Sequence, residues 1–253
     1  MRTCFVLVSA ILFISQGVSL ATPPSLVYRV DTRPPDEIFV HGFRAWGNDH
    51  NIVAHVNGHT CTGAARTSAF VSTMASFHMV DELVASHLRE RATTYVYSIR
   101  ADSNFYSAPA TVDYFQSYNP LAPLSLNSLR MSRRVQEWVA VDRIPPQNIS
   151  SVVARHRNGV NTFWMNPMYQ DRQTQGSSQF YLDHAEDTLQ HYRFPLNRPN
   201  QTTLWISACF SVCDTPIPSY YYAEGSIISL AAPQCVEQKV YRVEDALAVI
   251  FSL

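Results

Sequence analysis

The chain has 253 residues, 46% of them hydrophobic, and a formal net charge of −1 at pH 7. This length accommodates one large domain with a full hydrophobic core and is too short for two independent catalytic domains. A charge so close to zero gives no electrostatic reason to expect binding to nucleic acid or to a membrane surface, and we predict neither.

The N-terminal segment has the features of a cleaved secretion signal. Arg2 precedes an apolar run from Phe5 to Ile14, and Ser19 and Ala21 place small residues where a signal peptidase reads the chain. The alternative is a membrane anchor, but the run is well short of the roughly 20 apolar residues that a spanning helix needs. We therefore expect a signal peptide at residues 1–21 and a single domain over residues 22–253, with no membrane span.

The mature chain is predicted to open with a strand from Leu26 to Val30, a segment of β-branched and aromatic residues that Arg33-Pro34-Pro35 ends. Asp36 to Val40 then predicts one helical turn, which Gly42 ends.

A longer helix is predicted from about Phe77 to Arg91, where apolar residues recur at helical spacing. His87 lies on its apolar face, so we expect a packed core histidine rather than a catalyst. Thr94 to Ile99 predicts the next strand.

Val152 to Arg157 and Val160 to Met165 predict a hairpin, with Asn158-Gly159 as a tight primed turn between them. Asn166 to Gln201 is polar and poorly periodic, which predicts loops. No repeat and no glycine-rich phosphate loop is present, and strands outnumber helices, so the fold class is predicted to be α+β.

Two segments about a hundred residues apart resemble the catalytic A subunits of pertussis-like ADP-ribosylating toxins. They are Tyr28–Pro35 (YRVDTRPP) and Glu137–Ile149 (EWVAVDRIPPQNI), and the likeness extends over nearly the whole mature chain. The resemblance implies the ADP-ribosyltransferase fold, with two small, mostly antiparallel sheets around a cleft and peripheral helices. It also implies that NAD is the substrate, and it implies no metal.

Cleavage of NAD leaves positive charge on the ribose, which a fixed carboxylate can stabilise in the transition state. Glu137 matches the family's catalytic glutamate; without the family, a lone strand glutamate would be an ordinary charge at the sheet rim. His55 matches a histidine near the ribose and the acceptor, where it would assist the incoming nucleophile. A surface histidine on a short helix is the alternative.

Four further residues are carried over as NAD-binding. Arg29, in the Tyr-Arg-x-Asp segment that also contains Tyr28, would hold the phosphates or ribose and orient the glutamate. Its alternative is a structural salt bridge to Asp31. Ser72 would brace the pocket, and Trp46 would stack on nicotinamide or adenine unless it is a core anchor.

Val135 departs from the family pattern. If residues 135 to 139 form one strand, the side chain two before Glu137 shares its face and addresses the site. Arginine-modifying relatives place a second glutamate there, and the pertussis and typhoid toxin subunits place a glutamine. Valine offers no hydrogen bond, so we predict an acceptor other than arginine, or weak transfer with residual NAD hydrolysis.

Five cysteines become four when Cys4 leaves with the leader, which is the arithmetic of two disulfides in a secreted chain. The resemblance implies that Cys61 pairs with Cys209, leaving Cys213 for Cys235 or for a partner chain. Sequence alone permits three pairings. A zinc site is the alternative, but no compact His or Cys pair accompanies these cysteines at ligand spacing.

Cations are distributed unevenly, because eighteen are arginine and only Lys239 is lysine. A scarcity of ubiquitin acceptors suits a toxin subunit that passes through the host endoplasmic reticulum; codon bias is the alternative.

The apolar tail, about residues 239–253, is expected to associate with a pentameric B subunit, as in related toxins. The resemblance thus implies a secreted A subunit, exported through the bacterial periplasm and delivered to a host cell. There it would transfer ADP-ribose from NAD to a host protein, with a heterotrimeric G protein α subunit as the candidate. The alternatives are an NAD glycohydrolase with weak transfer and a catalytically silent binding component.

Overall fold

The computed structural model describes residues 22–61, 66–118, 126–186 and 188, and the backbone of two short strands at 222–223 and 226–227. The expected signal peptide, the other four cysteines and the tail from Lys239 lie outside the described residues. The elements in chain order are β1 (Leu26–Asp31), α1 (Pro35–His41), β2 (Phe43–Arg44), α2 (Ile52–Val56), β3 (Phe70–Met74), α3 (Phe77–Glu90), β4 (Thr93–Arg100), β5 (Phe105–Ser107), α4 (Ala108–Tyr118), α5 (Leu126–Val135), β6 (Glu137–Val141), β7 (Arg143–Ile144), the 3-10 helix η1 (Pro146–Asn148), β8 (Ile149–His156), β9 (Asn161–Met165), β10 (Tyr222–Ala223) and β11 (Ser226–Ile227). None of the helices in the described ranges combines the length and hydrophobicity needed to cross a bilayer.

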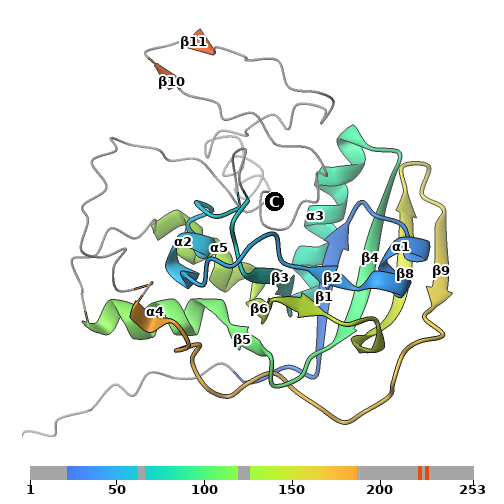
Figure 1. Cartoon of the computed structure of the whole chain (residues 1–253). Helices are drawn as coiled ribbons and strands as arrows, with labels where there is room; N and C mark the ends of the chain where they lie inside the picture. The colour runs from blue at the N-terminus through green and yellow to red at the C-terminus, as the bar shows by residue number, and fades with distance from the viewer. Residues whose placement is uncertain are drawn as a thin grey trace, which may run out of the picture.

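An antiparallel sheet of seven strands, ordered β5-β6-β3-β1-β4-β8-β9, forms the centre of the fold (Figure 1). The α+β class is confirmed. The two small sheets that were expected are joined, because β1 and β3 pair through a single residue pair, Tyr28 with Met74. On its other side, β1 pairs with β4 along its whole length. The sheet therefore opens between β1 and β3, and this opening positions the site described below.

Helices cover the two halves of the sheet differently. In Figure 1, α4 and α5 lie beside β5 and β6, whereas α1 and α3 lie beside β1, β4 and β8. The even-numbered side chains Tyr28 and Val30 of β1 pack toward α3, in a cluster with Met74 and Val80. Val27, two positions from Arg29 on the odd-numbered face, joins the cluster that contains Phe43. Alternation along β1 thus places Tyr28 and Val30 against one hydrophobic cluster and Val27, with Arg29, on the other face of the sheet.

Gly42 fixes the passage from α1 to the short β2–β7 ribbon. It ends α1 with a φ of 70°, in the left-handed region that favours glycine. A Cβ at this position would also run into the backbone carbonyl of Ile144 on β7. The ribbon is anchored on the core side by Phe43 and Ile144, which are paired across its two strands and fully buried.

The predicted hairpin between β8 and β9 is present, but its turn differs from the primed turn predicted. Gly159 has a φ of 82°, while Asn158 is not among the residues with positive φ. A primed type I turn requires positive φ at both central residues. Instead Gly159 N–H donates to the His156 carbonyl, and His156 N–H donates to the Val160 carbonyl. The three-residue loop therefore needs only one left-handed residue.

Val135 does not lie on the strand with Glu137, which corrects the prediction that it addresses the site. It is the last residue of α5, 3% exposed, and packs with Met74 and Val80 beneath α3. Gln136 follows with a φ of 51° and an exposed side chain, and β6 begins only at Glu137. The alternation that we assumed does not hold here because the helix end and the left-handed residue precede the strand.

His87 is a buried residue of α3, as its place on the apolar face predicted. It is 5% exposed, and its Nδ1 lies 3.2 Å from Thr94 Oγ1 on β4. Burial and repulsion by Arg91 lower its pKa to about 4. It therefore stays neutral near pH 7 and lies outside the site described next.

Candidate active site

Helix α2 places His55 in the interior. Asn51 caps the helix by accepting a hydrogen bond from Ala54 N–H at 2.9 Å, and all five residues of the helix are buried. A cap of this kind makes so short a helix possible, although most of its stability comes from burial. His55 is 1% exposed, with Nδ1 at 2.7 Å from Ser68 Oγ and Nε2 at 2.8 Å from Ser72 Oγ. Both ring nitrogens are therefore occupied, which fixes the orientation of the imidazole.

Glu137 begins β6 and lies between α2 and α5. One carboxylate oxygen, Oε2, accepts a 2.7 Å hydrogen bond from Ser132 Oγ on α5. The other, Oε1, lies 3.4 Å from His55 Nε2, an ion pair whenever the imidazole is protonated. The carboxylate is thus held from two sides, although only 4% of the residue is exposed.

Burial opposes ionisation of Glu137, but hydrogen bonds outweigh it. Desolvation acts to raise the pKa, whereas the contacts from His55, Ser132 and Ser72 together hold the pKa of this carboxyl below its ordinary value. A buried carboxylate kept ionised in this way can stabilise positive charge that develops on a bound substrate, because few competing water dipoles reach it.

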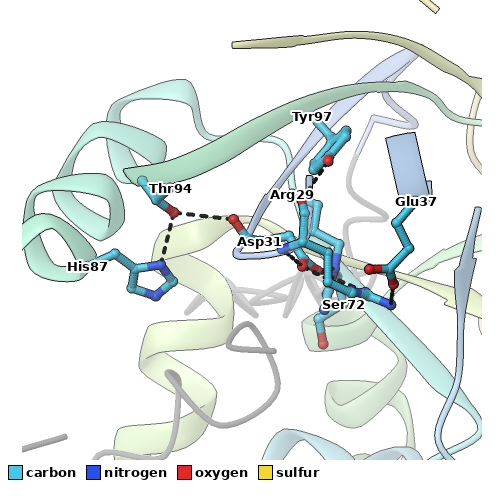
Figure 2. A network of polar contacts seen from close by, with 8 residues as sticks. Arg29, Asp31, Glu37, Ser72, His87, Thr94 and Tyr97 are labelled. Atoms are coloured by element: carbon cyan, nitrogen blue, oxygen red, sulfur yellow. Dashed lines mark hydrogen bonds and ion pairs between the residues drawn. The ribbon is translucent and has the colours of Figure 1, made fainter. Parts of the chain in front are cut away.

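Arg29 connects the two halves of the sheet across the opening between β1 and β3 (Figure 2). Its Nη1 donates to the Ser72 carbonyl of β3 at 2.7 Å, and its Nε donates to Asp31 Oδ2 at 3.1 Å. Both the structural salt bridge and a place at the site are therefore present. Arg29 is 3% exposed, and its guanidinium lies over the Phe43 ring at 5.2 Å.

Asp31 is shared by two arginines. It is fully buried and also accepts hydrogen bonds from the side chain of Arg33, to Oδ1 at 3.1 Å and to Oδ2 at 3.0 Å. Burial acts to raise its pKa, but the charges of Arg29 and Arg33 and these hydrogen bonds lower it overall. The network fixes Arg29, and through the Ser72 carbonyl it fixes β3 beside Glu137.

A pocket opens next to this group, lined by Arg29, Arg44, Trp46, His55, Phe70 and Val71. Trp46, predicted to stack on NAD, is half-buried in this wall, and the Arg66 guanidinium lies 4.4 Å from its ring centre. Among the described residues, no group of three His, Cys, Asp or Glu side chains is placed to hold a metal ion.

Of the predicted site residues, Glu137 and Ser72 contact the pocket-lining His55 without lining the pocket themselves, whereas Tyr28 is turned away from it. Its ring contacts Phe77 of α3 edge to face, with ring centres 5.1 Å apart. Because it neighbours Arg29 on β1, its side chain points to the opposite face.

Cys61 lies directly behind the candidate catalytic histidine. Its Sγ is 3.4 Å from His55 Nδ1, and it is disulfide-bonded. The expected partner, Cys209, lies outside the described residues, as do Cys213 and Cys235.

Two serines of the site were missed in the sequence. Ser132 holds Glu137 from α5, and Ser68 holds His55 from the segment before β3. Serine is common, and no sequence motif marks either position. The only available signal was that Ser132 lies five residues before Glu137, and this spacing is too unspecific to identify it.

Comparison with known proteins gives consistent matches. A family model described as "Pertussis toxin, subunit 1" matches residues 22–175. The pertussis toxin subunit 1 homolog of Bordetella parapertussis is 36% identical over 177 residues, which are 63% of this chain and 65% of that protein. The ADP-ribosylating toxin CARDS of Mycoplasma pneumoniae is 32% identical over 200 residues, covering 64% of this chain and 33% of that toxin. The chain thus spans less than two thirds of the length of these relatives. The solved structure named EcPltA superposes with a TM-score of 0.53 at 31% identity, covering 62% of this chain and 93% of that one.

Proposed function

Because this chain belongs to the pertussis toxin subunit 1 family, we propose that it is the catalytic A subunit of a secreted toxin that transfers ADP-ribose from NAD to a host protein. The observation that carries the proposal is the buried Glu137 carboxylate, held by Ser132 and His55 beside a pocket that presents arginine and tryptophan.

The chemistry that we propose breaks the bond between nicotinamide nitrogen and C1′ of the ribose. Nicotinamide leaves as a neutral molecule with the bonding electron pair, so positive charge develops on the ribose ring. Glu137, held below its ordinary pKa, would stabilise that charge. The acceptor then forms a bond to C1′ and releases a proton, and His55, held between Ser68 and Ser72, is the proposed acceptor of that proton.

Arg29 and Ser72 are proposed to shape the NAD pocket rather than to react. Arg29 is already committed to Asp31 and to the Ser72 carbonyl, so its first role is to keep β1 and β3 in place. Trp46 is proposed to stack on a ring of the dinucleotide, since it is half-buried in the pocket wall.

For the acceptor, we propose a side chain other than arginine on a heterotrimeric G protein α subunit, as the family resemblance suggested. What supports this is the absence of a second carboxylate among the described residues that line the pocket or contact Glu137. Val135 was expected to face the site without offering a hydrogen bond. It is instead buried in the core, so it brings no polar group to the site for a different reason.

A pentameric B subunit is the proposed partner, and the tail at about residues 239–253 is the proposed contact. Deleting Asp245 to Leu253 should abolish assembly with the B subunit while sparing release of nicotinamide from NAD. Loss of both in the deletion variant would instead assign this segment to the catalytic core.

The test uses biotin-labelled NAD and animal-cell lysate, with the mature protein in reduced and unreduced forms. Glu137→Gln keeps the size of the side chain and removes its charge, and Glu90→Gln at the end of α3 serves as the matched control. We expect a labelled band near the size of a G protein α subunit, lost at least 100-fold in Glu137→Gln and unchanged in the control.

Reduction is expected to raise the activity, because Cys61 is disulfide-bonded directly beside His55. Equal activity in both forms would contradict this. Nicotinamide release without a labelled band would indicate an NAD glycohydrolase. The absence of both signals would indicate a catalytically silent binding component.

A further inference from the structure

Two arginines face each other on the short β2–β7 ribbon. Arg44 and Arg143 are directly opposed in the antiparallel register, and both side chains are exposed. Neither makes a hydrogen bond or an ion pair within the described part of the chain, and Asp142, the neighbour of Arg143, pairs with neither. The other arginines near this ribbon differ, because Arg29 and Arg33 share Asp31.

The register brings these two like charges close together. Ala45 N–H donates to the Asp142 carbonyl at 2.7 Å, so Arg44 and Arg143 occupy a non-hydrogen-bonded position of the ribbon. At such positions the Cα atoms of an antiparallel pair lie about 4.5 Å apart, and the side chains are closest. Like charges directly opposite each other destabilise a β-ribbon, so this pair weakens the fold unless an anion lies between the two guanidinium groups.

The ribbon also holds the pair rigidly at the pocket. Phe43 and Ile144, the neighbouring pair, are fully buried and anchor both strands. Arg44 lines the same pocket as Trp46 and His55. Arg44 therefore stands at the pocket that also contains His55, the contact of Glu137, and Arg143 lies opposite Arg44 on the ribbon.

We propose that Arg44 and Arg143 form an anion site that binds the pyrophosphate of the dinucleotide. This rests on the proposed function, in which NAD is the substrate and its nicotinamide ribose lies at Glu137. A pyrophosphate carries two negative charges, and two guanidinium forks match its oxygens in number and geometry. Arg29, which is buried and bonded to Asp31 and to the Ser72 carbonyl, positions the sheet, while the exposed ribbon supplies the charge that binds the phosphates.

The experiment measures Arg44→Gln, Arg143→Gln and the double variant, with Arg157→Gln as the control. Arg157 is an exposed arginine of the β8–β9 loop, on the far side of β4 and β8 from the pocket. Nicotinamide release is followed with NAD and with nicotinamide riboside, which lacks phosphates. Binding of ADP and of adenosine is followed by calorimetry, which requires no catalysis.

We expect each single variant to raise KM for NAD at least about tenfold, the lower end of the range for a charge-assisted contact. KM for nicotinamide riboside, kcat and the Arg157→Gln control should not change. The apparent melting temperature should stay the same or rise, because the repulsion is relieved. ADP should bind more weakly to the double variant, while adenosine binding is unaffected.

An unchanged KM for NAD in the double variant, with nicotinamide still released, would overturn the anion site and leave the proposed function intact. Weaker labelling of the acceptor protein at unchanged KM for NAD would also overturn it, because the ribbon would then bind the acceptor. If no nicotinamide is released at all but the double variant loses ADP binding, the anion site stands and the proposed function fails.

Discussion

Replacing Ser132 with alanine tests whether the hydroxyl on α5 maintains the ionised state of Glu137. The 2.7 Å hydrogen bond joins two buried side chains, and a hydrogen bond to a charged group contributes about 1.5 to 3 kcal/mol. Alanine recovers about 0.5 kcal/mol through its better helix propensity. The expected net loss is therefore about 1 to 2.5 kcal/mol at pH 7, or roughly 2 to 10 °C in melting temperature for a domain of this size.

The loss should depend on pH in a definite direction. The pKa of Glu137 in the folded protein lies below its ordinary value of 4.5. Its ionised form therefore stabilises the fold above pH 4.5, and this stabilisation disappears as the pH falls through the lower, folded-state pKa. Removing the Ser132 hydroxyl raises that pKa, so the deficit of the variant should be full at pH 7 and shrink in acid.

Urea unfolding of the oxidised protein between pH 3 and pH 7 provides the assay, with nicotinamide release measured in parallel. Ser128→Ala, one turn earlier on the same helix and similarly buried, gives the comparison with another serine-to-alanine change that does not touch Glu137. A deficit that is equal at pH 3 and pH 7 would refute the reasoning, since the hydroxyl would then act through packing alone. We also expect kcat to fall about tenfold, because the carboxylate loses one of the contacts that hold it.

Gly42→Ala should lower the free energy of unfolding in urea by at least about 2 kcal/mol, because the added Cβ sits on a left-handed backbone and collides with the Ile144 carbonyl. Gly159→Ala has a similar φ and open space around it, so its loss should be about 1 kcal/mol, and equal losses would contradict the role of the collision. The free energy of unfolding of the wild type should fall by about 3 kcal/mol between pH 6.5 and pH 4, because the pKa of buried His87 is lowered to about 4 and only the unfolded chain binds the proton in that range. His87→Leu should not show this fall. The same acid sensitivity in wild type and His87→Leu would show that another group titrates.

Local pattern was sufficient for the elements whose period is uniform. The apolar spacing of α3, the β-branched run of β1 and the turn at Gly159 each appear within a few residues of the predicted bounds. The partnership of Arg29 and Asp31 could also be anticipated, because residues two apart on a strand share a face. Val135 shows the limit of this reasoning. Gln136, a left-handed residue between α5 and β6, interrupts the strand alternation, and no sequence pattern predicted that conformation.

The sequence by itself determined which residue types were available for the chemistry and, through its likeness to a family, which glutamate and histidine to select. Only the tertiary structure decided what surrounds them. Ser132 reaches Glu137 because α5 turns back onto β6, and Arg29 reaches the Ser72 carbonyl across 43 residues of chain because the sheet opens between β1 and β3. The opposed pair of Arg44 and Arg143 depends on the register of two strands about a hundred residues apart. Such long-range contacts are set by the packing of the whole core, and no local propensity specifies them.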